Sequence, residues 1–298
     1  MWTTIIVYVL LAILGAVFGS FAVAQVWRIR AFQLKEDLEL DPKSVDKVEW
    51  RRLKPLTEVN KSKDRSHCLS CGYQLRWFDL IPVFSWISLK GKCRKCHTSI
   101  GKTEIFGEIF LASLFALSAF FWPVNMFSSS ANMFEIGQFV LWLVSLVILL
   151  ILFIYDLKWS LLPLNQMLIF IAIAILFWSL RSFQLSVTID LVINLIISMV
   201  ILPGTYFVLN KMSDGQWVGS GDWIISIGLV FLLPNEPIYA AIVLFLSNFI
   251  GTIYILIMSM RNKTKIKRGV KIPFGPFLII ATIITAIFYP YMYSFLAF

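Results

Sequence analysis

The chain has 298 residues, of which 59% are hydrophobic and only 14% charged, with a formal net charge of +9 and a mean hydropathy of +0.81. Globular domains carry about 25% charged residues, so this composition excludes a cytosolic enzyme with one hydrophobic core, a disordered chain and a cysteine-dense secreted scaffold. It predicts an α-helical polytopic membrane protein.

A helix needs about 20 apolar residues to cross the hydrocarbon layer, and runs near this length recur along the chain. The first run lacks a preceding basic segment and exceeds the length of a signal-peptide core, so we interpret it as a membrane helix. About eight transmembrane helices are predicted: Trp2–Trp27, Ile105–Phe121, Phe139–Tyr155, Leu164–Leu180, Ile189–Leu209, Trp223–Leu233, Ile238–Met260 and Phe277–Phe298.

The positions of Lys and Arg indicate the orientation of these helices, because cytoplasmic loops collect basic residues. If the N-terminus lies outside, 25 of the 26 Lys and Arg fall on the cytoplasmic side and only Arg181 lies outside. The net charge is then a signal of topology and gives no reason to expect a nucleic-acid partner. We expect a multi-pass protein of the cytoplasmic membrane, with membrane lipids as partners.

The largest polar segment holds all four cysteines, in two Cys-x2-Cys pairs. Two such pairs predict a structural zinc site, with four thiolates about 2.3 Å from the metal and a small β-hairpin ribbon between the pairs. His67 and His97 are substitute ligands, and two disulfides are the alternative that a reducing compartment disfavours. The predicted zinc ligands are Cys68, Cys71, Cys93 and Cys96.

These features divide the chain into three parts. The expected parts are transmembrane helix 1 at 1–27, a small cytoplasmic zinc-ribbon-like domain at 28–103, and a seven-helix membrane domain at 104–298.

Acidic residues at the ends of membrane helices are the candidates for chemistry, since an ionisable group there is costly and functional by default. Asp156 closes the third predicted span and Asp222 opens the sixth, both at cytoplasmic ends. Two carboxyls at one depth suit an aspartic protease, in which one stays protonated as the acid and the other acts as base on a water. Gly219 and Gly221 let the backbone approach a substrate strand. Glu108 either lines the bundle interior or pairs with a loop lysine.

Simpler roles are open for each aspartate. Asp156 is equally explained as an interfacial residue beside Lys158, and Asp222 as the N-cap of a membrane helix. Asp190 and Asp214 are rivals for the pair. The first lies at the outer end of the fifth predicted span and the second in a polar loop, where a charge costs little.

Taken together, these residues resemble the prepilin peptidase family, bacterial membrane aspartic proteases of type IV pili and related secretion and DNA-uptake systems. The resemblance runs from about Gly15 to Phe277, and the order of its motifs makes it specific. The matching stretches are Gly19–Phe21, Arg65–Cys71, Trp77–Trp86, Gly91–Cys96, Glu108, Asp156 followed by Leu162-Pro163, Gly219–Asp222 and Ile272–Phe277.

The resemblance implies an enzyme of the bacterial inner membrane that cleaves the leader of prepilins or pseudopilins at the cytoplasmic face, with Asp156 and Asp222 as the catalytic pair. Family members with both cysteine pairs usually also methylate the new N-terminus with S-adenosylmethionine. Most relatives carry a Lys two residues after the second aspartate, where this chain has Trp223-Ile224. No glycine-rich turn that opens a helix marks a nucleotide site.

Three other functions fit parts of the pattern. Presenilin-like and signal-peptide-peptidase-like proteases also pair a Tyr-Asp with a Gly-x-Gly-Asp, as Tyr155-Asp156 and Gly219–Asp222 do here. A membrane transporter would use paired acids to relay protons. In a zinc-ribbon membrane scaffold, the two aspartates would act only as helix caps.

Overall fold

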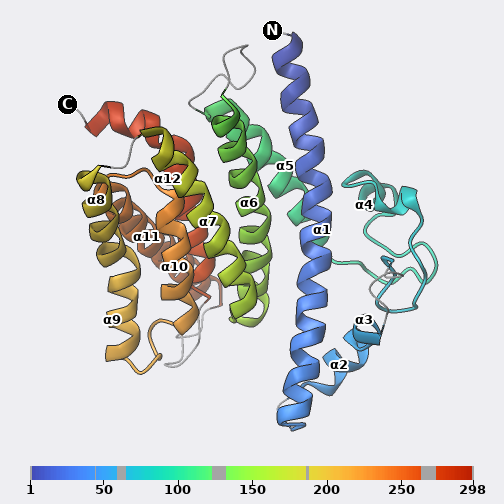
Figure 1. Cartoon of the computed structure of the whole chain (residues 1–298). Coiled ribbons are helices and arrows are strands. Elements are labelled where there is room, and N and C mark those ends of the chain that lie inside the picture. The colour runs from blue at the N-terminus through green and yellow to red at the C-terminus, as the bar shows by residue number, and fades with distance from the viewer. Residues whose placement is uncertain are drawn as a thin grey trace. The chain divides into compact units, whose positions relative to one another are not determined.

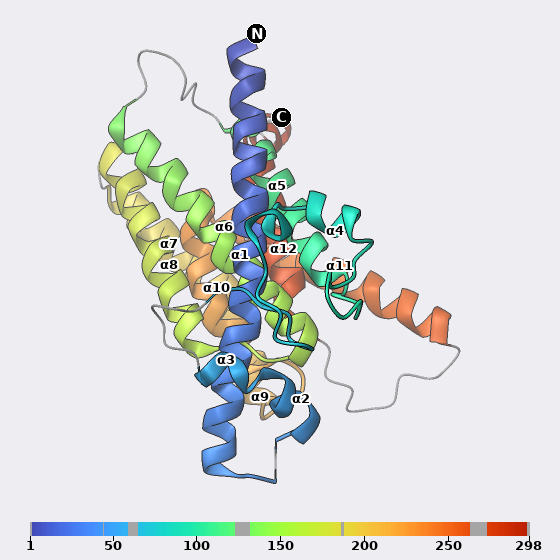
Figure 2. The same cartoon turned by 90° about the vertical axis from the view of Figure 1, so that its right-hand side faces the viewer.

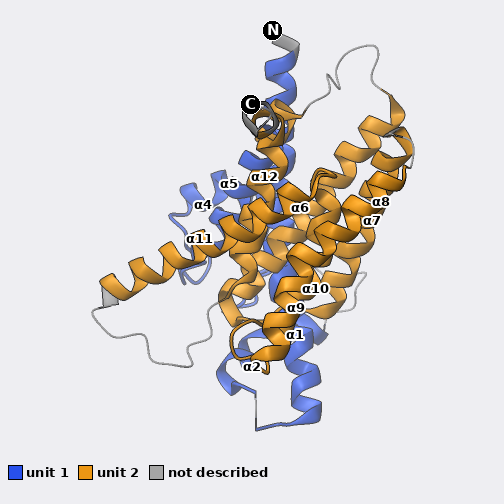
Figure 3. Ribbon diagram, turned by 90° about the vertical axis from the view of Figure 1, so that its left-hand side faces the viewer, with its two compact units in different colours: residues 1–116 blue, residues 117–298 orange. Residues whose placement is uncertain are grey.

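The computed structural model describes residues 2–43, 45–58, 65–122, 132–185, 188–262 and 273–296. Throughout these ranges the regular structure is helical, without a β-strand. Seven of the described helices are long and apolar enough to cross a membrane, which confirms the polytopic α-helical class. Figure 1 labels these helices, and the chain divides into two compact units, residues 1–116 and 117–298 (Figure 3).

In the first unit, helix α1 runs well past the end of its apolar stretch. It continues 13 residues beyond Trp27, through a polar segment without glycine or proline. Its last turns pack on two short helices, where Leu34 and Leu53 form part of a buried cluster (Figure 2). The elements of this unit are α1 (Trp2–Leu40), α2 (Lys47–Leu53), α3 (Pro55–Glu58), the 3-10 turn η1 (Trp77–Leu80), α4 (Phe84–Ser88) and the first part of α5 (Thr103–Phe121).

Two glycines let α1 and α5 approach closely. A Cβ atom on Gly15 would lie 2.6 Å from the Leu111 carbonyl oxygen, and one on Gly19 would lie 2.5 Å from the Gly107 carbonyl oxygen. No side chain fits at those distances, so the two backbones are in direct contact, as small residues allow between membrane helices. This contact fixes the position of Glu108, whose Cα lies against Gly19.

The second unit is a bundle built around α6, in which every residue from Leu149 to Asp156 is buried. Helix α6 packs on α7 and α12, and α10 packs on α7, η2 and α12. Its elements are α6 (Met133–Trp159), α7 (Leu164–Leu185), α8 (Ile189–Met199), the π-helical turn η2 (Val200–Gly204), α9 (Thr205–Met212), α10 (Ser220–Leu232), α11 (Pro237–Asn262) and α12 (Gly275–Leu296).

Two of the eight predicted spans differ from a simple helix. The fifth is interrupted by η2 because Pro203 has no N–H to donate and its ring disturbs the α-helical pattern. The sixth is α10, which has 13 residues and is therefore about 20 Å long, too short to count with the other seven. The end of the last predicted span, residues 297–298, lies outside the described residues. Residues 263–272, which include most of the basic cluster and Ile272, also lie outside them.

The β-hairpin ribbon predicted between the cysteine pairs is wrong for this chain. Two isolated antiparallel bridges, His67 to Gln74 and Lys92 to Ser99, close the cysteine turns, and η1 and α4 occupy the stretch between them. Pro82 cannot donate a hydrogen bond to a strand ladder. The carboxylate of Asp79 also accepts the Arg76 N–H at 3.2 Å, which favours a helical turn at this point.

Candidate active site

Asp156 lies in the last turn of α6 and is almost fully buried, with 4% of its surface exposed. The helix ends soon afterwards because Ser160 takes a left-handed conformation and donates its N–H to the Asp156 carbonyl at 2.8 Å. The side-chain Oδ2 atom is buried without a hydrogen-bond partner among the described residues. Buried polar atoms normally have a partner, so this oxygen is an exception, at the point where Gly275 approaches the carboxyl group.

Asp222 lies in the first turn of α10 and is 7% exposed. Its Oδ2 accepts the N–H of Gly219, the residue before the helix, at 2.9 Å. The side chain therefore does satisfy a backbone donor at the helix start, although from the third helical position and not as the N-cap. The helix N-terminus favours a negative charge, and the bond from Gly219 fixes the orientation of the carboxyl group.

The end of α6 and the starts of α10 and α12 meet around Leu162. The Leu162 side chain lies 2.8 Å from where a Cβ on Gly221 would be, and 3.5 Å from the same position on Gly275. A Cβ on Gly275 would also lie 2.8 Å from Asp156 Oδ2. The two carboxyl groups are near enough for Asp222 to act electrostatically on Asp156. Two aspartates far apart in the sequence thus share one end of the second unit.

Tyr206 is a buried residue beside this pair for which the sequence predicted no role. Its hydroxyl lies 3.0 Å from Ser247 Oγ and accepts a hydrogen bond from Asn248 Nδ2 at 3.1 Å. Its ring lies 5.3 Å from the Phe274 ring, next to the start of α12, and it is within electrostatic range of Asp222. The polar Asn248 within an apolar span was the available signal for this contact.

The other acidic candidates lie elsewhere. Asp190 is exposed in the first turn of α8, and Asp214 is exposed in a turn with a φ of 47°. Glu108 is buried in the first unit, where its Oε2 accepts the N–H of Val83 at 2.6 Å. Among the described residues, the Glu108 carboxylate is therefore bound by a backbone amide and not by a loop lysine. That Glu108 lines the site stays a prediction.

The four cysteines form a cluster that could hold a metal ion such as zinc. Their Sγ atoms all lie within 4.8 Å of one another. The Sγ atoms of Cys68 and Cys96 are 3.8 Å apart, and those of Cys71 and Cys93 are 3.9 Å apart. A tetrahedron of thiolates about 2.3 Å from a zinc ion has edges of roughly 3.8 Å, so the spacing fits this metal.

Both cysteine pairs adopt the same turn. The N–H of the first cysteine in each pair bonds to the carbonyl oxygen five residues later, from Cys68 to Tyr73 and from Cys93 to Thr98. Hydrogen bonds with Thr98 lower the pKa of the Cys96 thiol to about 6, because they stabilise its thiolate. Desolvation and the neighbouring sulfurs raise the pKa of the Cys71 thiol to about 11. The thiolate is the form that binds a metal.

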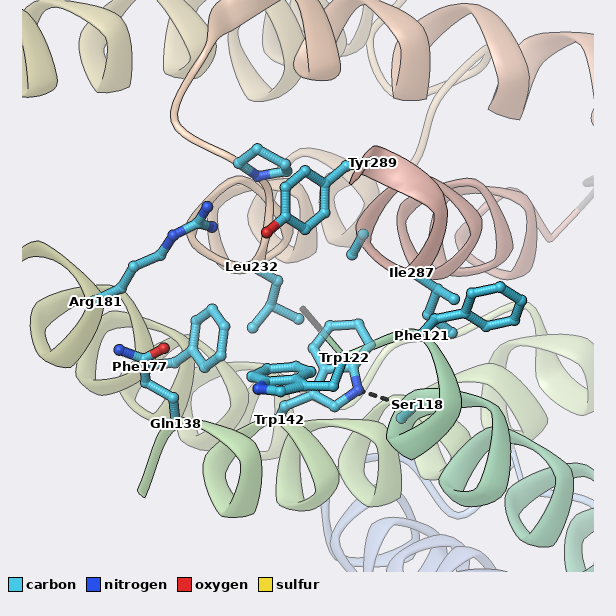
Figure 4. Close-up of a pocket in the computed structure, with 12 residues that line it drawn as sticks. Ser118, Phe121, Trp122, Gln138, Trp142, Phe177, Arg181, Leu232, Ile287 and Tyr289 are labelled. Carbon is cyan, nitrogen blue, oxygen red and sulfur yellow. Dashed lines mark hydrogen bonds between the residues drawn. The ribbon is translucent and has the colours of Figure 1, made fainter. Parts of the chain in front are cut away.

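A pocket with five aromatic side chains among its twelve lining residues lies at the other end of the second unit (Figure 4). Gln138 and Trp142 come from the first turns of α6 and Leu232 from the end of α10, whereas the two aspartates lie at the opposite ends of these helices. The guanidinium of Arg181 sits 5.8 Å from the Tyr289 ring at its rim. This pocket contains neither aspartate, so it does not form the candidate active site.

The comparisons with known proteins point to one family. A family model described as the bacterial peptidase A24 N-terminal domain matches residues 13–122. A prepilin leader peptidase/N-methyltransferase from Dichelobacter nodosus is 28% identical over 78% of this chain and 74% of its own length, and one from Pectobacterium carotovorum is 26% identical over 91% and 89%. The chain is therefore similar to prepilin leader peptidases over most of its length. No solved structure matches it.

Other similarities to prepilin peptidases are partial. A type 4 prepilin-like proteins leader peptide-processing enzyme from Escherichia coli O78:H11 is 30% identical, and the match covers 39% of this chain and 40% of the relative's length. The matched family domain contains the cysteine cluster and Glu108 and ends before α6. The two aspartates therefore lie in the part of the chain that the domain model does not cover.

Proposed function

We propose that this protein is an aspartic endopeptidase of the bacterial inner membrane that cleaves the leader of prepilins or pseudopilins. The convergence of two buried carboxyl groups, on Asp156 and Asp222, carries the proposal. The names of the similar proteins, which describe prepilin leader peptidases, support the choice of substrate.

The proposed chemistry uses the two carboxyls in different protonation states, since two close carboxylates do not readily both ionise. The ionised carboxyl takes a proton from a water molecule as the water attacks the scissile carbonyl carbon. The protonated carboxyl donates its proton to the carbonyl oxygen. When the C–N bond breaks, the leaving amine takes up a proton. Gly219 orients Asp222 for this reaction through its N–H. Gly275 places no side chain against Asp156 Oδ2, and Gly221 leaves room for the Leu162 side chain.

The reaction is proposed to occur at the cytoplasmic face, with the N-terminus of the chain outside. The support is the distribution of charge: that orientation puts 25 of the 26 Lys and Arg on the cytoplasmic side. Reporter fusions after residues 60 and 125 test it, because the first should be active as a cytoplasmic reporter and the second as an external one. The reverse pattern overturns the orientation without affecting the peptidase proposal.

Zinc is the proposed metal of the cysteine cluster, held by Cys68, Cys71, Cys93 and Cys96. A site closed by four thiolates has no open position for water or substrate. Zinc would therefore supply folding stability to this segment and no part of the peptide cleavage.

Methylation of the new N-terminus by S-adenosylmethionine is proposed as a second activity. Its support is the name of the similar proteins, prepilin leader peptidase/N-methyltransferase. Mass spectrometry of the processed product tests it: with S-adenosylmethionine supplied, the product should gain one methyl group. A product of unchanged mass would show that the protein cleaves the leader but does not methylate the new N-terminus.

The decisive test compares aspartate variants in a cleavage assay with detergent-solubilised protein and a prepilin. Asp156→Asn and Asp222→Asn should each lose about 10²-fold or more in kcat, the usual contribution of a general acid or base. Asp190→Asn and Asp214→Asn are matched controls at exposed sites and should cleave at the wild-type rate. If both Asp156→Asn and Asp222→Asn cleave normally, the aspartic mechanism is wrong.

A further inference from the structure

The cysteine-bearing part of the first unit carries an unusual apolar surface. Five large apolar side chains on η1, α4 and the turn between them are exposed, and Trp77 and Phe84 are each 77% exposed. We call this surface the apolar ledge; it consists of Trp77, Leu80, Ile81, Phe84 and Ile87. Large apolar side chains exposed together on neighbouring turns favour a surface that meets a partner or a membrane.

The ledge is a built feature and not a loosely folded loop. On the inner side of α4, Trp86 packs over Gly91 and donates its Nε1–H to the Gly101 carbonyl at 2.9 Å. At the start of α4, Val83 has a φ of 62°, a strained conformation for a β-branched residue. The Glu108 carboxylate accepts the Val83 N–H at 2.6 Å and holds it there. The fold thus directs Trp86 inward and leaves Phe84 exposed.

That same hydrogen bond sets the height of the ledge on a membrane helix. Glu108 lies five residues after Thr103, the first residue of α5, which is about 8 Å along the helix axis. Its neighbours Phe106 and Ile109 are large, apolar and about half exposed, as expected for side chains that face lipid. The ledge is therefore attached to a membrane-spanning helix at the level where its apolar surface begins.

The charges around the ledge match an anionic lipid surface. Between residues 65 and 102 there are seven Lys and Arg and one acidic residue, Asp79. Asp79 is buried and paired with Arg94, so it presents no charge to an approaching membrane. Lys90, Lys92 and Lys95 are exposed close to the ledge in sequence. Basic residues near a membrane surface attract anionic lipids, and Trp is favoured at the level of the headgroups.

We propose that the apolar ledge inserts into the cytoplasmic leaflet of the bilayer and seats the cysteine cluster on an anionic lipid surface. Trp77 and Phe84 enter the boundary between headgroups and acyl chains, and the surrounding lysines contact lipid phosphates. The part of this segment that carries the cysteines, residues 65–102, is on this basis a membrane-bound element and not a domain that projects into solution.

Photo-crosslinking in a bilayer tests this insertion. The photoreactive residue p-benzoylphenylalanine replaces Phe84, or in a second variant Ile87, in the full chain in nanodiscs of phosphatidylglycerol and phosphatidylcholine. The matched control carries the same residue at Val48, which is also 77% exposed but lies on α2. Unchanged metal content in each variant verifies that the cysteine cluster is folded.

Illumination should give lipid adducts, identified by mass, at positions 84 and 87 and none above background at 48. Raising the phosphatidylglycerol fraction should increase the adducts at 84. Absence of lipid adducts at both ledge positions, or equal yields at 48, overturns the proposal. If added prepilin captures the crosslink at 84 and abolishes the lipid adduct, the ledge is a substrate surface and the membrane assignment is wrong.

Discussion

The glycine at the start of α12 provides a sharp test of the site geometry. A Cβ atom on Gly275 would lie 2.8 Å from Asp156 Oδ2, whereas ordinary contacts of a Cβ begin at 3.4 Å. In Gly275→Ala the carboxyl group or the start of α12 must therefore move by about 0.6 Å or more. A misplacement of about 1 Å at a reacting centre costs on the order of 10²-fold in rate.

We therefore expect Gly275→Ala to lower kcat for prepilin cleavage by roughly 10-fold to 10²-fold, with a smaller effect on KM. The assay is steady-state cleavage in detergent, with the melting temperature as a measure of folding. Gly137→Ala is the matched control, because it adds the same methyl group to α6 at an ordinary 3.4 Å from Leu180 Cδ1. A wild-type kcat in Gly275→Ala would refute the requirement that the Asp156 carboxyl keep its present position.

Three other changes test features outside the aspartate pair. Gly19→Ala places a methyl group against the α5 backbone and should destabilise the protein by about 1–3 kcal/mol; a melting temperature as high as that of Gly137→Ala would contradict the close packing. Cys93→Ser should reduce bound zinc, measured by elemental analysis, from about one ion per chain to nearly none, and retained zinc would indicate a different ligand set. Arg94→Met leaves the buried Asp79 carboxylate without its ion-pair partner, at a cost of about 2 kcal/mol because Arg94 itself is partly exposed. Limited trypsin digestion of the cysteine segment should then be faster, and Asp79→Asn in the same chain should restore resistance.

Much of the organisation was readable from local patterns. Apolar runs near 20 residues predicted the membrane helices, since the bilayer imposes that length on any spanning helix. The two cysteine pairs predicted a four-sulfur cluster, because the Cys-x2-Cys spacing brings two sulfurs together within a single turn. Asp156 and Asp222 were candidates for chemistry because a carboxylate next to an apolar segment is energetically costly. The structure brings both to one end of the second unit. Their catalytic role stays a prediction.

The features that the sequence did not predict depend on contacts between distant helices. Gly275 matters for the geometry of the site only because the end of α6 lies against the start of α12. The hydropathy of the sequence does not predict that contact. Tyr206 looked like one more aromatic residue in an apolar span, yet its hydroxyl belongs to a polar group with Ser247 and Asn248. The extension of α1 was missed for a related reason: the apolar run ends at Trp27, but tertiary packing maintains the helix beyond it.

That extension gives the N-terminal helix mechanical properties. The 13 residues after Trp27 add about 20 Å of helix, without a glycine or proline at which it could bend. Leu34 of α1 and Leu53 of α2 belong to a buried cluster that packs the far end of α1 against the short helices α2 and α3. A rigid rod transmits rotation as well as displacement, so a turn of α1 about its own axis within the bilayer rotates α2 and α3 by the same angle. Helix α1 thus couples its orientation in the bilayer to that of α2 and α3. A bilayer that alters the tilt of α1 also reorients the polar surface of these two helices.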